Sequence, residues 1–171
     1  MNYNPSTIAR IGDIHEGLRV DSGELANGTY MAENQVEDFN VYGRIKLLQL
    51  FFETIVTVDA DKATLFQYTY SCTALGVTSF KLGLVSLAIT GLAVGGRCTW
   101  VGGAVGDSNH LVTGGPGYTD LMSNTPAVVG YEGGTGTIGH LTTTATQETG
   151  SHRHSLFYVP MSDGAYVTAV R

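Results

Sequence analysis

Glycine spacing is the feature of this sequence that most constrains its fold. From residue 76 onward, short runs of Val, Ile, Leu and Thr alternate with glycine clusters, which lie at 95–96, 102–103, 114–117 and 133–134. Glycine weakens helices, whereas β-branched residues favour strands. Because glycine also permits the tight turns between neighbouring strands, this alternation is typical of an antiparallel sandwich or barrel. We therefore predict an all-β protein.

The composition supports this fold class and a single core. The chain has 171 residues, of which 23 are glycine, 43% are hydrophobic and only 14% are charged. This length is typical of one domain that buries enough surface to fold without disulfides. We expect the last strands at residues 136–144, 155–160 and 164–170. The glycine clusters do not repeat at a fixed period, so neither a solenoid nor a propeller is predicted.

The first 43 residues differ from the rest of the chain. They hold seven of the fifteen acidic residues but few large apolar side chains, and these follow neither a strand nor a helix period. We predict an extended, irregular acidic N-terminal arm over residues 1–43 and an antiparallel β-sandwich or jelly-roll-like body over residues 44–171. The arm is either a disordered tail or a segment that becomes ordered on a neighbouring subunit.

A hairpin is predicted at the start of the body. Within residues 45–58, apolar side chains occupy both odd and even positions, and the run ends in β-branched residues. This pattern favours a long strand with two partly buried faces. Residues 59–62 supply a polar turn, and residues 63–70 form the returning strand. Its aromatic residues alternate onto one face, which we expect to pack as core residues do: Phe66, Tyr68 and Tyr70.

An uncharged segment and the net charge argue against two classes of partner. Residues 82–96 are uncharged, but these 15 residues are interrupted by glycine and are too few to span a membrane, so we expect buried strands here. The formal net charge is −6, which opposes binding to a phosphate backbone. No secretory signal is recognisable at the N-terminus, so synthesis in the cytosol is expected. We predict no nucleic acid and no membrane as partners.

Two histidines are the best candidates for a metal site. His152 and His154 are two residues apart, and on a strand both side chains would point to one face. They would form half of a site, but no further His, Cys, Asp or Glu completes a recognisable ligand spacing. We therefore predict no metal ligand and place both histidines at a surface or intersubunit strand end. Cys72 and Cys98 also lack the short spacing of a zinc site, and a single disulfide between them stays open.

The other polar motifs do not favour catalysis. The glycine-rich segment 133–139 lacks the Lys-Ser or Lys-Thr of a phosphate-binding loop, so turn glycines explain this segment and residues 102–106 better. Asp107, Ser108 and His110 are too close in sequence to converge as nucleophile, base and orienting group. We predict no enzyme activity, no catalytic residue and no cofactor.

Acidic and aromatic residues have structural explanations as well. Glu53, Asp59 and Asp61 could supply paired carboxylates for glycoside chemistry, but acids are common at a solvated hairpin tip. The nine Tyr, the six Phe and Trp100 could form a sugar-binding platform. Most of them alternate within predicted strands, however, as core residues do.

Five short segments carry a resemblance to a known family. They are residues 43–52, 91–97, 101–106, 128–130 and 158–169. Through these segments, the sequence from Gly43 to the end, about three quarters of the chain, resembles the cement or decoration proteins of tailed bacteriophages. These are small auxiliary proteins on the phage head.

The resemblance implies a virion structural protein that binds the outer surface of a phage capsid and cements neighbouring major capsid proteins. It also implies a homotrimer on the capsid surface, with an N-terminal arm that crosses a seam between capsomers. The two apolar faces of residues 45–58 independently favour a homo-oligomer. The alternatives are a phage tail or fibre component and a carbohydrate-binding β-sandwich module.

Overall fold

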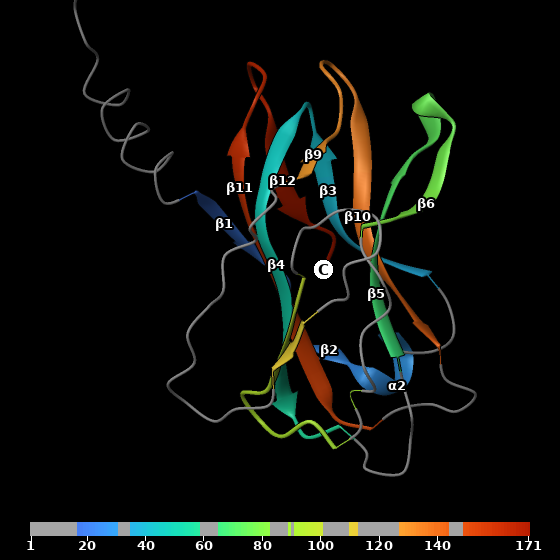
Figure 1. Ribbon diagram of the computed structural model, residues 1–171, viewed down its shortest axis with the longest axis vertical. Helices are drawn as coiled ribbons and strands as arrows, with labels where there is room; N and C mark the ends of the chain where they lie inside the picture. The colour runs from blue at the N-terminus through green and yellow to red at the C-terminus, as the bar shows by residue number, and fades with distance from the viewer. Residues whose placement is uncertain are drawn as a thin grey trace, which may run out of the picture.

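The computed structural model describes residues 17–30, 35–58, 65–82, 89, 91–100, 110–112, 127–143 and 149–171. These residues form two antiparallel β-sheets that pack on one hydrophobic core (Figure 1). Two short helical elements, α2 (Asn27–Tyr30) and η1 (Thr73–Leu75), lie in connections between strands. The predicted all-β sandwich is confirmed.

The larger sheet has β11 and β4 at its centre. Its strands follow the order β1-β11-β4-β7-β8. Two short strands extend this order: β2 pairs with the start of β11, and β9 pairs with the start of β4. The bounds are β1 (Leu18–Asp21), β2 (Leu25–Ala26), β4 (Ile45–Val56), β7 (Arg97–Trp100), β8 (His110–Val112), β9 (Ala127–Val129) and β11 (Ser151–Pro160). Strand β11 pairs with β1 and β2 on one side and with β4 on the other. One of its faces packs against the smaller sheet.

The smaller sheet follows the order β12-β3-β10-β5-β6. Its strands are β3 (Gln35–Tyr42), β5 (Leu65–Cys72), β6 (Val77–Lys81), β10 (Thr135–Thr143) and β12 (Tyr166–Ala169). The strands predicted near residues 136–144, 155–160 and 164–170 are therefore confirmed as β10, β11 and β12. In this sheet β10 is central, between β3 and β5.

Side chains from both sheets form the core. The largest of them are fully buried and include Phe39, Ile45, Leu47, Leu50, Phe52, Phe66, Tyr68, Trp100 and Ile138. The predicted burial of Phe66, Tyr68 and Tyr70 on one face of their strand is confirmed. The indole N–H of Trp100 donates a hydrogen bond to the carbonyl of Leu82 at 2.7 Å, so the one polar atom of this side chain is satisfied inside the core.

Three connections carry the chain from one sheet to the other at the same end of the sandwich, the upper end in Figure 1. They join β3 to β4, β9 to β10 and β11 to β12. The amide of Gly43 donates to the carbonyl of Gly134, and the amide of Met161 donates to the carbonyl of Arg44, both at 2.8 Å. Gly43 has a φ of 73°, and a Cβ there would lie 2.9 Å from the Cβ of Ala165. Only glycine fits this crossing without strain.

The predicted hairpin between residues 45–58 and 63–70 is wrong. Strand β4 belongs to the larger sheet and β5 to the smaller one, so the two strands share no backbone hydrogen bonds. They meet through side chains instead, because the rings of Phe52 and Phe66 lie 4.9 Å apart between the sheets. The predicted turn at residues 59–62 lies outside the described residues.

The irregular arm predicted over residues 1–43 is wrong for the part that the structure describes. Strand β1 pairs with β11, and β3 pairs with both β10 and β12. Phe39 and Val41 on β3 are fully buried. The sandwich therefore includes residues from Leu18 onward, and residues 1–16 lie outside the described residues.

The uncharged segment also differs from its prediction. Leu82, Ile89 and Leu92 are buried in the core, but the described residues 91–96 form turns rather than a strand. Strand β7 begins only at Arg97. Across the described parts of the chain, no helix is both long enough and apolar enough to cross a membrane.

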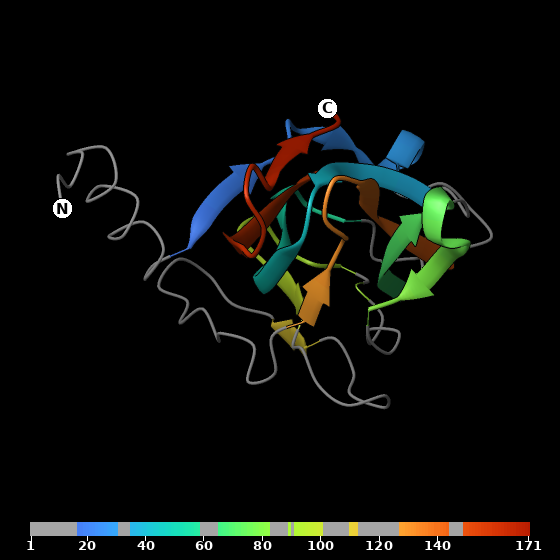
Figure 2. The ribbon, with the colours of Figure 1, turned by 90° about the horizontal axis from the view of Figure 1, so that it is seen from above.

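The C-terminus lies against N-terminal strands, as Figure 2 shows. The amide of Gly23 donates to the carbonyl of Arg171 at 2.8 Å, and the amide of Val170 donates to the carbonyl of Asp38 at 2.9 Å. The two ends of the described chain are therefore joined through backbone hydrogen bonds.

Candidate functional site

Three histidines meet between the two sheets. His140 comes from β10 in the smaller sheet, and His152 and His154 come from β11 in the larger one. All three side chains have 0% exposure. The ring centroid of His154 lies 4.8 Å from those of both His140 and His152, while the centroids of His140 and His152 are 5.8 Å apart. We call these three side chains the histidine cluster.

The prediction that His152 and His154 share one face of a strand is confirmed, but their predicted place at a surface or strand end is wrong. Both imidazoles face the interior, because β11 lies in the middle of the larger sheet and packs against the smaller sheet. His140 was missed because it is separated from His152 in sequence and belongs to the other sheet. The only signal for His140 in the sequence was its position among the alternate, inward-facing residues of the strand predicted over residues 136–144.

A β-bulge turns Asp38 toward the histidine cluster. Ile138 is opposite Phe39 and Gly139 is opposite Glu37, which leaves Asp38 as an extra residue in β3. Such bulges bend a strand and re-aim a side chain. Asp38 is therefore buried like its neighbour Phe39, and its carboxylate oxygen Oδ2 accepts a hydrogen bond of 2.8 Å from Nδ1 of His140.

Asn27 fixes the tautomer of His152. The side-chain amide nitrogen of Asn27 donates to the carbonyl of Thr149 at 2.6 Å, so its oxygen Oδ1 faces Nδ1 of His152, also at 2.6 Å. An amide oxygen only accepts, so Nδ1 of His152 carries the proton. Nε2 of His152 is then a lone-pair nitrogen, and it is buried without a hydrogen-bond partner.

His154 lies between a phenol and a carboxylate. Its Nδ1 is 2.8 Å from the hydroxyl of Tyr68, and its Nε2 is 3.5 Å from Oδ1 of Asp38. Neither Nε2 of His154 nor Oδ1 of Asp38 has a hydrogen-bond partner. The Tyr68 hydroxyl can donate or accept, so His154 is free to place its proton on either nitrogen.

Aromatic rings pack against the histidine cluster. The ring of Phe66 stacks on His140 at 5.1 Å, and that of Phe52 meets His152 edge-on at 5.8 Å. Burial lowers the pKa of His152 and of His154 well below the ordinary value of 6.5, and the neighbouring imidazoles lower both further. Burial also raises the pKa of Asp38, although His140 opposes this shift. His152 and His154 are therefore neutral near pH 7.

The histidine cluster has the composition of a metal site. One ring nitrogen from each of His140, His152 and His154 lies within 4.8 Å of the other two. Neutral imidazole is the form that binds metal ions, and it suits Zn²⁺, Cu²⁺, Fe²⁺ and Ni²⁺. Because all three side chains are fully buried, the site can hold an ion but offers no surface on which a substrate could be bound.

Of the acidic and cysteine residues considered above, the structure describes Glu53, Cys72 and Cys98. Glu53 lies on the outer face of β4, where it pairs with Arg153 at 2.9 Å and with Arg97 at 3.7 Å. Asp59 and Asp61 lie outside the described residues. Cys72 and Cys98 are both described and buried, and they form no disulfide with each other.

The remaining motifs are structural or undescribed. Gly133 has a φ of 72° in the turn before β10, which confirms a turn at the start of the segment 133–139. The segment 102–106 and the residues Asp107 and Ser108 lie outside the described residues, while His110 begins β8.

Comparisons with protein-family models, with curated proteins and with solved structures find no match for this chain.

Proposed function

We propose that this protein is a structural component of a bacteriophage virion, which binds the outer surface of the capsid and cements neighbouring major capsid proteins. The resemblance of five sequence segments to decoration proteins supports this proposal. The all-β sandwich is the fold that this resemblance implies.

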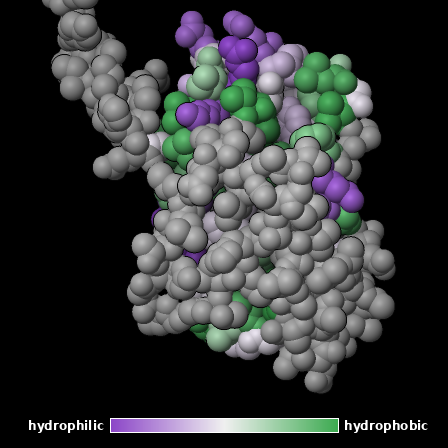
Figure 3. Space-filling model, viewed as in Figure 1, coloured by the Kyte–Doolittle hydropathy of each residue, from purple (hydrophilic) through white to green (hydrophobic). Residues whose placement is uncertain are grey.

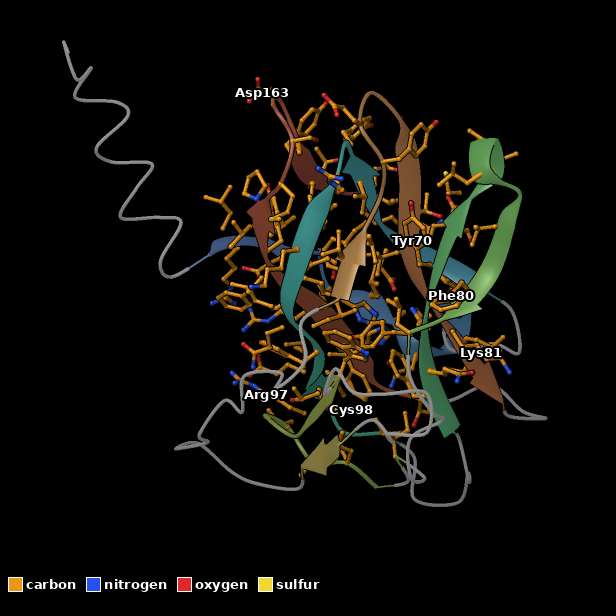
Figure 4. The ribbon with its side chains drawn as sticks, turned by 45° about the horizontal axis from the view of Figure 1, so that its top comes forward. Tyr70, Phe80, Lys81, Arg97, Cys98 and Asp163 are labelled. Atoms are coloured by element: carbon orange, nitrogen blue, oxygen red, sulfur yellow. The ribbon has the colours of Figure 1, made fainter. Side chains whose placement is uncertain are left out.

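An exposed apolar surface on the smaller sheet carries the proposal. Strand β6 lies at the edge of this sheet, beside β5. Phe80 on β6 is 58% exposed, and Leu75 in the connection that precedes β6 is 53% exposed. Hydrophobic side chains gather over β5 and β6 at the upper right of Figure 3. Figure 4 shows Phe80 beside Lys81 on β6. We call Leu75, Phe80 and strand β6 the β6 edge.

The β6 edge has the properties of a protein-binding surface. An edge strand presents backbone N–H and C=O groups that can pair with another chain, and exposed apolar side chains gain free energy when a partner covers them. Fully burying a phenylalanine side chain contributes about 1.5–3 kcal/mol. The occupant we propose is a neighbouring protein subunit of the virion shell.

The proposed assembly is a homotrimer, in which several modest contacts act together. When three linked copies engage the shell at once, each further contact forms at a high effective concentration. Light scattering of the purified protein is expected to give the mass of three chains. A monodisperse monomer at micromolar concentration would contradict this part of the proposal.

A non-enzymatic role is consistent with the histidine cluster. The exposures of its three imidazoles and of Asp38 are at most 2%. A buried cluster of this kind contributes to stability rather than to turnover.

The experiment is a particle-binding assay. Wild-type protein is added to purified phage shells that lack it, and the bound copies are counted against the major capsid protein after sedimentation. We expect a fixed ratio for the wild type and about 10–100-fold weaker binding for Phe80→Asp, from the burial energy of one phenylalanine.

Met161→Asp is the matched control, since Met161 is 44% exposed in the connection between β11 and β12. It places the same charge on an exposed apolar site away from β6. If the wild type does not sediment with shells, the proposed function is wrong. If both variants bind equally weakly, the β6 edge is not the contact.

A specific observation also favours a carbohydrate-binding role as the second candidate. The rings of Tyr42 and Tyr166 stack at 4.4 Å with an interplanar angle of 15°, and Tyr166 is 48% exposed. Such a pair offers an aromatic face to a sugar ring. A glycan array separates the two functions: binding that is lost in Tyr166→Ala but kept in Phe80→Asp would favour this candidate.

A further inference from the structure

We propose that His140, His152 and His154 bind one divalent transition-metal ion, with Zn²⁺ as the preferred ion, and that this ion joins the two sheets. The proposal is independent of the virion role, because it concerns only the interior of the sandwich.

The geometry is close to that of a three-histidine site. With Zn–N bonds of about 2.0–2.1 Å and tetrahedral angles, two ligand nitrogens lie about 3.3 Å apart. The ring nitrogens of the histidine cluster all lie within 4.8 Å of one another. Binding therefore requires the nitrogens to approach by at most about 1.5 Å.

Each imidazole is oriented by an oxygen on its other nitrogen. Nδ1 of His140 contacts Asp38, Nδ1 of His152 contacts Asn27, and Nδ1 of His154 contacts Tyr68. Metal-binding histidines usually donate their second ring N–H to such a partner, which fixes the ring and raises its basicity. For His152, whose Nδ1 carries the proton, this arrangement assigns Nε2 as the ligand atom.

The buried atoms without a hydrogen-bond partner point to an occupant. Nε2 of His152, Nε2 of His154 and Oδ1 of Asp38 are all buried in this way. Buried polar atoms in proteins are normally satisfied, so three together in one place call for an explanation. An ion bound to the histidine nitrogens satisfies the two imidazoles directly. The carboxylate of Asp38 then supplies the negative charge that a buried cation needs.

Tyr68 allows His154 to change tautomer on binding. When Nε2 of His154 holds the ion, Nδ1 carries the proton and donates it to the oxygen of Tyr68.

Zn²⁺ is the best fit among the ions that imidazole binds. It has no geometric preference from d-electrons, so it tolerates ligands that two different sheets impose. The ion would connect β10 of the smaller sheet to β11 of the larger one. Full burial of the ligands gives it a structural role, in which metal binding stabilises the fold.

The first test uses the untagged wild-type protein. After expression in zinc-supplemented medium and gel filtration, elemental analysis is expected to give one metal ion per chain. Removal of the ion by unfolding in chelator, followed by refolding, should lower Tm. Refolding with free Zn²⁺ at 100 times Kd should raise Tm by about 5–10 °C over the metal-free protein. Co²⁺ in place of Zn²⁺ should give visible absorption bands that differ from those of the hydrated ion, because imidazole nitrogens replace water as ligands.

Variants localise the ion. His152→Gln is expected to reduce the metal content at least tenfold, and Asn27→Ala, which keeps all three ligands, should weaken affinity about 10–100-fold. His110→Gln is the matched control, because it removes a histidine from β8, a strand that pairs with β7 rather than with β10 or β11. It is expected to keep one ion per chain.

Two results would overturn the proposal. One is wild-type protein that contains only trace metal and shows no change of Tm with chelator or with Zn²⁺, which would leave the cluster as a metal-free polar network. The other is loss of the ion in His110→Gln to the same degree as in His152→Gln. The wild-type measurements decide the question even if His152→Gln does not fold.

Discussion

Nδ1 of His140 lies 2.8 Å from Oδ2 of Asp38, and neither side chain is exposed to solvent. The second oxygen of the same carboxylate lies 3.5 Å from Nε2 of His154, which belongs to the other sheet. One carboxylate therefore contacts imidazoles from both sheets. Because a buried charge is costly unless it is paired, the stability of the sandwich depends on this contact.

Asp38→Ala is expected to be strongly destabilising. Removing one partner of a buried pair leaves the other unsatisfied and typically costs about 3–5 kcal/mol. Asp38→Asn should cost clearly less, because the amide oxygen can still accept the N–H of His140. Urea unfolding of both variants measures the difference. Equal losses, or a loss below about 1 kcal/mol for the alanine variant, would show that the contact contributes little.

Gly139→Ala should destabilise the sandwich through a steric clash at the bulge. A Cβ at this position would overlap the carbonyl oxygen of Val36 on the neighbouring strand. Overpacking of this kind typically costs about 1–3 kcal/mol. Gly23→Ala is the control, since the nearest atom to its Cβ would lie at an ordinary 3.6 Å. Thermal unfolding should show a lower Tm for Gly139→Ala alone.

Asp21 should contribute stability that is lost in acid. Burial raises the pKa of this carboxyl, but hydrogen bonds from Ser155 and Arg19 outweigh burial and hold it below the ordinary value of 3.8. A lowered folded-state pKa means that the stabilisation is complete above pH 3.8 and disappears as the pH falls through the lowered value. The pair is partly exposed, so we expect only about 0.2–1 kcal/mol.

The measurement is the free energy of unfolding of wild type and Asp21→Asn across this acidic range. The two curves should differ near neutral pH and converge in acid. Curves that stay parallel down to the lowest pH would contradict the role of Asp21.

Two N-terminal truncations should behave differently. Deleting residues 1–16 retains every strand described here, so we expect Tm to change by only a few degrees. Deleting residues 1–43 removes β3 from between β10 and β12, together with the buried Phe39 and Val41, and should abolish cooperative unfolding. A folded product of the longer deletion, detected by circular dichroism and gel filtration, would show that β3 is dispensable.

Much of the fold class follows from local patterns, but the candidate site does not. Alternation placed Phe66, Tyr68 and Tyr70 on one buried face, and it placed His152 and His154 together on one face of another strand, as the structure confirms. That the second face is buried was not predicted. Asp38 could not be predicted, because the bulge in β3 breaks the alternation at that residue. Asn27 could not be predicted either, since its contact with His152 joins residues 125 positions apart.

The sequence by itself determined that this chain forms strands separated by glycine turns, because strand propensity, alternation and turn formation depend on residues only a few positions apart. The tertiary structure alone decided which strands pair. It placed β4 and β5 in different sheets, inserted β3 between β10 and β12, and brought His140 to His154. Strand pairing depends on which distant apolar faces can be buried together, and no short segment carries that information.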